Sequence, residues 1–426
     1  MIGTARAAKP DISCYSSEMD DATTGLDAFR DALRTWLESA VPKSQFGLPV
    51  QLPGEAGTTE SPELTADRAR YLEIMIERGF TAPTWPKEYG GGGLSPAAAQ
   101  VLREEMDHYG LAPPLLGMGL WLLGPTLLVH GSEQQKREFL PKIATDEHRW
   151  CQGFSEPGAG SDLAALCTRA ERDPSGEFYT INGSKIWTSG AQHANWMFML
   201  VRTDATRKHD GISFLLVDMK QPGIEVKPIQ LISGHSMFCE VFFCDVRAEA
   251  RHVVGGVDQG WAVAKTLLNF ERSGLGGVSS GSAALRRVAL TGARLAALAK
   301  QTVGERDGRI ADGALRDQVA RLMLDELALR LTIQRSSELR KANGAPGSEI
   351  SLFKLYHSEL GQRRDELSMT LRGTQALGWD GSAFAHEDLA LTRGWLAAKA
   401  TTIYGGTSEI QRNIIAKRVL KLPSRA

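Results

Sequence analysis

Apolar residues recur along the chain with a helical period near both ends and with a strand-like alternation in the middle. Over residues 23–147 the pattern predicts helices, and the segment GLDAFRDALRTWLESAV shows it best. Its apolar side chains fall three or four residues apart or side by side and form one stripe: Leu26, Phe29, Leu33, Trp36 and Leu37. A second helix is expected to begin at Ser95-Pro96, a cap followed by proline at the first helical position, and to end at Gly110.

Between residues 148 and 254 the pattern changes to short runs that are typical of β-strands. The segment EFYTINGSKIWTSG alternates and contains Asn182-Gly183, a pair that predicts a tight hairpin turn. Four further runs follow at intervals of roughly ten to fifteen residues: NWMFMLVRT, GISFLLVDM, IEVKPIQL and CEVFFCDVRAEA. Short strands at this spacing are typical of a small barrel or sandwich.

Helical patterns return after residue 254, in long segments that begin near Trp261, Ala314 and Ser348. The order of helices, sheet and helices predicts an α+β multi-domain chain. We expect an N-terminal helical domain over 23–147, a β-barrel or sandwich domain over 148–254 and a C-terminal helical domain over 255–426. The first 22 residues lack the apolar segment of a signal peptide, so we expect a disordered lead there.

The composition excludes several classes of protein. The 426 residues include 49 basic and 50 acidic side chains, a formal charge of −1, so no basic surface predicts binding to nucleic acid or to a membrane. The apolar stretch over 115–129 is interrupted by glycine and proline and is too short to span a membrane. Five cysteines without a CxxC pair indicate reduced thiols, and therefore a cytoplasmic protein without a zinc site.

Two glycine- and serine-rich segments carry candidate chemistry. In GFSEPGAGSD the glycines let the backbone approach a ligand, and Ser155 and Ser161 offer hydroxyls and amides to an anionic group. Taken alone, this segment is more often explained as a plain turn, since it is neither a dinucleotide GxGxxG nor a loop with a phosphate-binding lysine. The strand KIWTSG favours a ligand site over a plain turn, because Trp187 followed by hydroxyl groups suits a flat heteroaromatic ring with polar edges.

A third segment, IYGGTSEIQR, lies near the C-terminus. Its glycine turn leads directly into Thr-Ser and a helix with an amphipathic pattern. Such a turn usually holds a ligand or another segment against its backbone.

Together these three segments resemble the acyl-CoA dehydrogenase family. GFSEPGAGSD is similar to that family's first signature, KIWTSG to its flavin-facing strand, and IYGGTSEIQRNIIAKRVL to its C-terminal signature. They occur in the family's order and at about its spacing, and the resemblance covers about residue 25 to the end. It implies an N-terminal helical domain, a central β-domain and a C-terminal four-helix bundle. Phe154 is an unusual residue within the first signature.

The resemblance implies an FAD enzyme that removes an α-proton from an acyl-CoA thioester and passes the β-hydrogen as hydride to flavin N5. It also implies an electron-transfer flavoprotein as the acceptor of the electrons. The residues that would line the flavin pyrophosphate and pyrimidine side are Phe154, Ser155, Gly160 and Ser161. Those along the isoalloxazine ring would be Trp187 and Ser189, and those near the start of the last helix Thr407 and Glu409.

The proton-abstracting acid is absent from its commonest place in the family, directly after the tyrosine, where this chain has Gly405 after Tyr404. The branch with isovaleryl-CoA and long-chain acyl-CoA dehydrogenases carries the acid on another helix, and the matching residue here is Glu271 in LLNFERSG. Without the family, Glu271 beside Arg272 is simply a surface ion pair. The resemblance gives Arg272 a role toward the CoA phosphates or in orienting the base, and it places Asn269 near the CoA. It also implies that Tyr404 and Gly405 face the substrate.

Two elements of the family are missing. The Arg-x-x-Phe-Gly element, which reaches the FAD of a neighbouring subunit, is replaced by AALAKQTVGERDGRIADGALRD, and the adenine-side glycine motif is reduced to LRGTQALGWDG. We therefore expect either a heteromer with a related subunit or a homotetramer with altered FAD contacts. Three functions stay open: a dehydrogenase that uses Glu271, a non-catalytic FAD-supporting subunit, and a flavin monooxygenase of the same fold. The sequence favours the first and does not define the acyl group.

Overall fold

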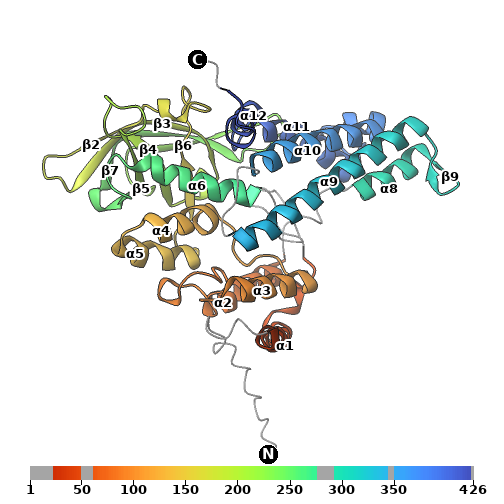
Figure 1. Ribbon diagram of the computed structural model, residues 1–426, viewed down its shortest axis with the longest axis horizontal. Coiled ribbons are helices and arrows are strands. Elements are labelled where there is room, and N and C mark those ends of the chain that lie inside the picture. The colour runs from red at the N-terminus through yellow and green to blue at the C-terminus, as the bar shows by residue number, and fades with distance from the viewer. Residues whose placement is uncertain (1–22, 49–60, 276–291, 344–349, 424–426) are drawn as a thin grey trace, which may run out of the picture.

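In the computed structural model of the chain, a curved β-sheet lies beside two groups of helices, the N-terminal group below it and the C-terminal group to its right in Figure 1. The structure describes residues 23–48, 61–275, 292–343 and 350–423. The predicted order of helices, sheet and helices is confirmed. The expected disordered lead, residues 1–22, lies outside the described residues.

The N-terminal helices form a small core of their own. They are α1 (Thr23–Ala40), α2 (Pro62–Glu77) and α3 (Pro96–Tyr109). The predicted stripe on α1 faces this core, where Phe29, Leu33 and Leu37 are fully buried. The predicted ends of α3 are confirmed: the Ser95 side chain accepts a hydrogen bond from the Ala98 N–H, and Gly110 closes the helix at φ 64°.

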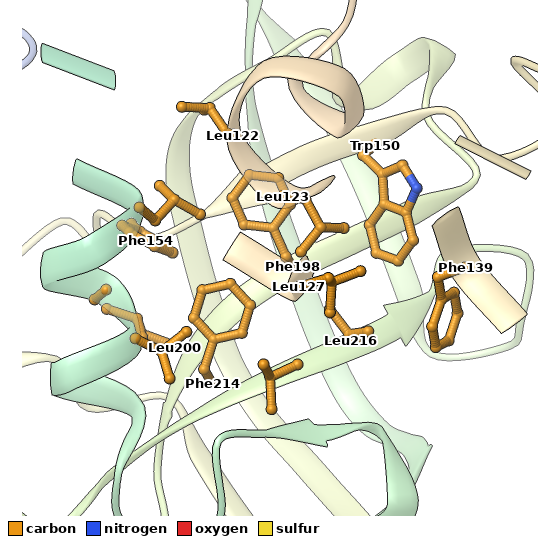
Figure 2. Packing of buried hydrophobic residues seen from close by; sticks show 14 of the residues in the cluster. Leu122, Leu123, Leu127, Phe139, Trp150, Phe154, Phe198, Leu200, Phe214 and Leu216 are labelled. Carbon is orange, nitrogen blue, oxygen red and sulfur yellow. The ribbon is translucent and has the colours of Figure 1, made fainter. Parts of the chain in front are cut away.

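Two further helices, α4 (Gly124–His130) and α5 (Glu133–Ala144), join this region to one face of the sheet. A π-helical turn, η4 (Gly119–Leu123), precedes α4. Figure 2 shows Leu122, Leu123 and Leu127 packed with the aromatic rings of Trp150, Phe198 and Phe214 from the sheet. Phe198 and Phe214 stack with their ring centroids 5.9 Å apart, and Phe154 meets both rings edge-on. This cluster is the core on which the sheet and its covering helices depend.

The sheet has eight strands, paired in the order β6-β7-β3-β2-β4-β5-β8, with β1 beside β4. The strands are β1 (Trp150–Gly153), β2 (Arg169–Arg172), β3 (Phe178–Ser189), β4 (Trp196–Arg202), β5 (Ile212–Asp218), β6 (Ile224–Ile229), β7 (Phe238–Glu249) and β8 (Val253–Val254). Strands β5 and β7 are not neighbours in this order, yet Leu215 of β5 and Val241 of β7 share one buried cluster. The sheet therefore curls over its own inner face, as expected of a small barrel or sandwich.

The predicted hairpin at Asn182-Gly183 is wrong. Both residues lie inside the continuous strand β3, where the register with β7 shifts between Ile181 and Gly183. The Asn182 side chain exchanges hydrogen bonds with Asp245 of β7, which replaces the lost ladder bonds. Gly183 has φ 148°, and a Cβ there would lie 2.7 Å from the Cα of Thr168. The glycine thus allows a bulge and a close approach rather than a turn.

Long helices form the C-terminal part. They are α6 (Gly260–Leu275), α8 (Gly292–Val303), α9 (Gly313–Asn343), α10 (Ile350–Arg372), α11 (His386–Ala398) and α12 (Ser408–Ile414). A small hairpin of β9 (Glu305–Arg306) and β10 (Arg309–Ile310) joins α8 to α9. Figure 1 shows α6 across the sheet and α8–α11 extending away from it, with α12 between the sheet and the bundle. Among the described helices, none combines the length and the apolar character needed to cross a membrane.

Replacing Gly183 by alanine tests the bulge in β3. The new methyl group would crowd Thr168 and the backbone would keep an unfavourable φ, so we expect the free energy of unfolding to fall by about 1–3 kcal/mol. The same change at Gly117, which has open space around it, is the matched control and should be nearly neutral. Urea unfolding of both variants measures the difference, and equal effects would contradict this account of the bulge.

Candidate active site

The first glycine-rich segment lies directly against the end of β3. The backbone carbonyl of Ser155 accepts a 2.9 Å hydrogen bond from the Ile186 N–H. This bond is possible because β3 slips register against β7 between Lys185 and Thr188, which frees the intervening backbone from the ladder. Glu156 and Ala159 exchange two backbone hydrogen bonds of 3.0 Å and close the segment into a tight turn. Two of the predicted cofactor segments are therefore one structural unit.

A buried ion pair fixes this unit. Lys185 is completely buried, and its Nζ donates hydrogen bonds to Glu156 Oε1 at 2.7 Å and to the Phe154 carbonyl at 3.2 Å. The Glu156 carboxylate also accepts from the backbone N–H groups of Cys167 and Thr168, at 2.6 and 3.0 Å. A buried pair of charges is tolerated when such bonds satisfy both partners.

The pKa values of both members of this pair are lowered, but for different reasons. Burial lowers the pKa of Lys185 to about 8, although the charge of Glu156 opposes the shift. Burial alone would raise the pKa of Glu156, but Lys185 and the backbone donors outweigh it and leave that pKa low. Glu156 is therefore ionised near neutral pH, and it holds the segment around it by accepting hydrogen bonds.

Trp187 occupies the bulge in a conformation that is rare for a bulky residue. Its φ is 61°, in the left-handed region, and its side chain is 54% exposed. The ring meets Phe238 edge-on, with the centroids 6.2 Å apart. Strain of this kind at an exposed aromatic residue is characteristic of ligand sites. The indole thus presents a large apolar surface beside the glycine-rich segment.

The other predicted cofactor residues of the sheet differ in how far their side chains are exposed to a ligand. The Phe154 side chain is buried beside the stacked rings of Phe198 and Phe214, as Figure 2 shows, so its backbone is what it can offer to a ligand. Gly160 and Ser161 are exposed, and a Cβ on Gly160 would meet open space. Ser155 and Ser189 are half-buried.

The C-terminal turn is held by two buried side chains. Gly405 and Gly406 have φ values of 63° and 89°. Lys354 of α10 donates a 2.7 Å hydrogen bond to the Gly406 carbonyl, and Gln411 of α12 donates to the Gly405 carbonyl at 3.1 Å. Any other residue at position 405 would cost about 1–2 kcal/mol in this left-handed conformation. The absence of an acid there has a backbone reason, since the turn favours glycine.

Helix α12 begins immediately after this turn. The Thr407 hydroxyl accepts a 3.2 Å hydrogen bond from the Ile410 N–H and so caps the helix. Glu409 is exposed, and hydrogen bonds from its own backbone N–H and from Thr407 lower its pKa. Tyr404 is 45% exposed next to the turn.

Glu271 lies near the end of α6, half-buried, where α6 packs against α10. Burial lowers the pKa of Lys354 on α10, although the charges of Glu271, Glu359 and Glu409 oppose that shift. Lys354 binds the Gly406 carbonyl. The helix of the predicted base thus packs against the helix that holds the glycine turn, although the base and the turn are far apart in the sequence. Asn269 is exposed on the same helix. The Arg272 side chain lies outside the described residues.

Contacts between the sheet and the bundle place the two halves of the site near each other. A Cβ on Gly234, in the loop between β6 and β7, would lie 3.1 Å from the ring of Trp379. The same loop contains Met237, whose carbonyl accepts a 2.9 Å hydrogen bond from the Gly190 N–H at the end of the Trp187 strand. The motif LRGTQALGWDG therefore supplies a contact between the bundle and the sheet.

The segment that lacks the expected Phe-Gly element has its own structure. It contains the β9–β10 hairpin, whose turn residues Asp307 and Gly308 have φ values of 52° and 73°. These values suit a tight two-residue turn.

Family models match almost the whole chain. They are the acyl-CoA dehydrogenase N-terminal domain over residues 27–147, the middle domain over 151–246 and the C-terminal domain over 258–420. The chain belongs to the acyl-CoA dehydrogenase family. The predicted fold and the predicted class of oxidoreductase are thereby confirmed.

Two curated members of this family align along most of the chain. An acyl-CoA dehydrogenase of Mycolicibacterium smegmatis, IpdE1, is 37% identical over 404 residues, which are 93% of this chain and 97% of that protein. FadE34 of Mycobacterium tuberculosis, also an acyl-CoA dehydrogenase, is 35% identical over 94% of this chain and 54% of its own length.

Among solved structures of the family, a complex described as the Tcur3481-Tcur3483 steroid ACAD matches with a TM-score of 0.69 and 27% identity, over 95% of this chain and 99% of that chain. The ChsE4-ChsE5 complex from Mycobacterium tuberculosis matches with a TM-score of 0.67 and 27% identity, over 95% of this chain and 100% of that chain.

Sequence reasoning missed three residues that hold the site together: Lys185, Glu156 and Lys354. A signal existed for the first pair, since a lysine within an alternating strand and a glutamate within the neighbouring glycine-rich segment are both unusual places for a charge. Lys354 lies in SLFKLYHSEL, where nothing in the local pattern distinguishes it from an exposed lysine. Its role depends on segments far away in the chain.

Replacing Lys185 by methionine tests the buried pair. The change leaves Glu156 as a buried carboxylate without its cation, so we expect a loss of about 3–5 kcal/mol in the free energy of unfolding. The double variant with Glu156→Gln should lose less than the two single changes together, which a double-mutant cycle in urea would measure.

The matched control for this prediction is Lys208→Met. Lys208 forms a 2.8 Å pair with Asp162 of the same segment, but both side chains are more than half exposed, so about 1 kcal/mol or less is expected. A Lys185 variant as stable as the Lys208 variant would contradict a structural role for the buried pair.

Proposed function

We propose that the chain catalyses the FAD-dependent α,β-dehydrogenation of an acyl-CoA thioester, with Glu271 as the base. The observation that carries the proposal is the junction at the end of α6. There Glu271 lies half-buried on α6, which packs against α10, and Lys354 of α10 holds the Gly405–Gly406 turn, which has no acid of its own. A carboxylate beside the turn is what proton abstraction from an α-carbon requires.

The residues present suit an FAD. Trp187 offers a strained, exposed indole, and the neighbouring Gly160 leaves open space above its Cα. The buried hydroxyls of Thr188 and Ser408, on the strand of Trp187 and at the start of α12, have no hydrogen-bond partner within the described chain. Polar atoms of this kind indicate a missing ligand or water.

The cofactor would therefore lie along Trp187 and Ser189, with its phosphates toward Ser155, Gly160, Ser161 and the backbone of Phe154. Thr407 and Glu409 would approach it from the start of α12. When bound, FAD supplies the acceptor for the hydride that leaves the β-carbon.

The chain itself contributes the proton transfer and its setting. Glu271 takes the α-proton at a carboxylate oxygen, and backbone amides near Tyr404 and Gly405 are candidate donors to the thioester carbonyl, where negative charge develops. Entry of the acyl chain removes water from around Glu271, which raises its pKa and makes it a stronger base near neutral pH. Asn269 and Arg272, on the same helix, would lie toward the CoA.

A bulky, ring-containing acyl group is the substrate class that the relatives favour. The similar Tcur3481-Tcur3483 complex is described as a steroid acyl-CoA dehydrogenase. The electron acceptor would be an electron-transfer flavoprotein, as the family resemblance implies. A panel of short, branched, long and steroid-derived acyl-CoAs, added anaerobically while flavin bleaching is followed, would identify the preferred class.

Replacing Glu271 by glutamine tests the base. The variant should bind FAD but lose flavin bleaching by acyl-CoA by roughly 10²–10⁴-fold, because the amide cannot accept the α-proton. Stopped-flow absorbance under anaerobic conditions measures the rate. The matched control is Glu366→Gln on α10, where the side chain is 56% exposed and pairs with Lys399.

The outcomes separate the competing functions. Unchanged bleaching in Glu271→Gln would show that another residue is the base. A wild-type chain that never bleaches with any acyl-CoA would support a non-catalytic subunit, and one that instead consumes oxygen with a reductant would support a monooxygenase.

We further propose that the chain works in an assembly with a related subunit. The solved complexes that resemble it pair two named chains, Tcur3481 with Tcur3483 and ChsE4 with ChsE5. On α9, Leu324, Leu327 and Leu331 are 66%, 39% and 54% exposed and fall three and four residues apart, so they form an apolar stripe on one face of the helix. A stripe of this kind suits a helix-packing interface.

Flavin content tests this assembly. We expect the chain purified alone to hold FAD incompletely, and coexpression with a neighbouring acyl-CoA dehydrogenase gene to raise the ratio of flavin to protein absorbance. In the coexpressed complex, Leu324→Glu should lower the mass measured by light scattering, whereas Val129→Glu, an exposed position on α4, should not. Full FAD occupancy of the chain alone would rule out the need for a different partner and would leave a homo-oligomer.

A further inference from the structure

Trp187 is exposed because β3 contains one extra residue at this point. Lys185 lies opposite Val241 of β7 and Thr188 lies opposite Cys239, so three steps along β3 match two steps along β7. Lys185 and Thr188 are both fully buried, although an undisturbed strand would bury residues two apart. The bulge therefore turns Trp187, two residues after Lys185, to the surface.

The glycine-rich segment replaces β7 as the partner of this bulge. The Ile186 N–H donates a 2.9 Å hydrogen bond to the Ser155 carbonyl. One residue earlier, Lys185 Nζ donates to the Phe154 carbonyl at 3.2 Å and to Glu156 Oε1 at 2.7 Å. Two consecutive residues of β3 thus bind three consecutive residues of the segment.

Glu156 connects this contact to a third piece of the chain. Its carboxylate accepts hydrogen bonds from the N–H groups of Cys167 and Thr168, at 2.6 and 3.0 Å. The Thr168 hydroxyl in turn donates a 3.1 Å hydrogen bond to the carbonyl of Ser184, the residue before Lys185. The hydrogen bonds therefore close a ring that leads from β3 through Glu156 and Thr168 back to β3. In a buried network of this kind each bond supports the others, so the bulge and the segment are held together.

We propose that Lys185 and Glu156 are positioning residues for the cofactor: the buried pair holds the bulge of β3 in the conformation that presents Trp187 to the flavin. The backbone of Trp187, at φ 61°, is strained, and such strain persists only where the surrounding structure fixes it. The side chains of the pair are 0% and 8% exposed, so they act through Trp187 and not by touching the ligand. The inference rests on the proposed place of FAD along Trp187.

The chain offers variants that separate positioning from stability. Lys185→Met removes the charge and the hydrogen-bond donor, and Glu156→Gln removes the opposite charge but keeps an acceptor oxygen. The double variant leaves no unpaired charge in the core, so we expect it to stay folded. Lys208→Met is the matched control, because Lys208 pairs with Asp162 of the same segment but is 57% exposed.

Fluorine NMR of the full-length protein labelled with 5-fluorotryptophan observes Trp187 directly, before any FAD is added. Trp187→Phe assigns its resonance among those of the nine tryptophans. In Lys185→Met and in the double variant we expect this resonance to move or to split, because the bulge is no longer held in one conformation. The resonance of Trp36, buried in the N-terminal core, should stay in place and show that the protein is folded.

Quenching of flavin fluorescence during a titration with FAD measures the consequence for the cofactor. We expect the Kd for FAD to rise roughly tenfold or more in Lys185→Met and in the double variant, because an indole that is not held in place must be ordered when the flavin binds. In Lys208→Met the Kd should stay within about twofold of the wild-type value.

A folded double variant that matches the wild type in the Trp187 resonance or in the Kd for FAD would overturn the proposal. If Lys185→Met does not fold, the double variant and Glu156→Gln decide by the same two measurements. Failure of the proposed cofactor site gives a different result. Trp187→Ala would then leave the Kd unchanged as well, although the Trp187 resonance would still move in the Lys185 variants.

Discussion

The packing of α6 against the sheet determines where the rest of the site can lie. The helix begins at Gly260, where a Cβ would be 2.3 Å from the carbonyl carbon of Ser213, so only glycine allows this approach to β5. Val263, Ala264 and Leu267 then enter the same core as the aromatic rings of the sheet. Each large apolar side chain buried there contributes about 1.5–3 kcal/mol. The eleven steps along the helix from Gly260 to Glu271 span roughly 17 Å, which carries the glutamate from the sheet to the bundle.

Both halves of the site depend on a buried lysine that binds a backbone carbonyl. Lys185 ties the glycine-rich segment to β3, and Lys354 ties the C-terminal turn to α10. In the sheet, Glu156 also pairs with the Lys185 ammonium group at 2.7 Å. A turn rich in glycine has little side-chain packing of its own, so a charged hydrogen bond from a rigid element is an effective way to fix it.

The local patterns predicted the elements well where one physical effect dominates. The stripe on α1, the caps of α3 and the strands β4 to β7 follow directly from periodicity and from cap chemistry. Asn182-Gly183 misled the prediction because the same glycine that allows a turn also allows a bulge, and pairing with β7 decided between them. Tertiary packing also explains the unusual Phe154, because its ring belongs to the core, edge-on to Phe198 and Phe214, rather than to a ligand surface.

The sequence by itself determined the order of the domains, the family and the vacancy at Gly405, because these depend on residue type and on spacing along the chain. The tertiary structure decided which charges meet. Lys185 and Glu156 are 29 positions apart, and Gly406 lies 52 positions from Lys354, so no local pattern could pair them. Electrostatic and hydrogen-bond partners depend on distances through space and on burial, and both exist only once α6, α10 and α12 have packed together.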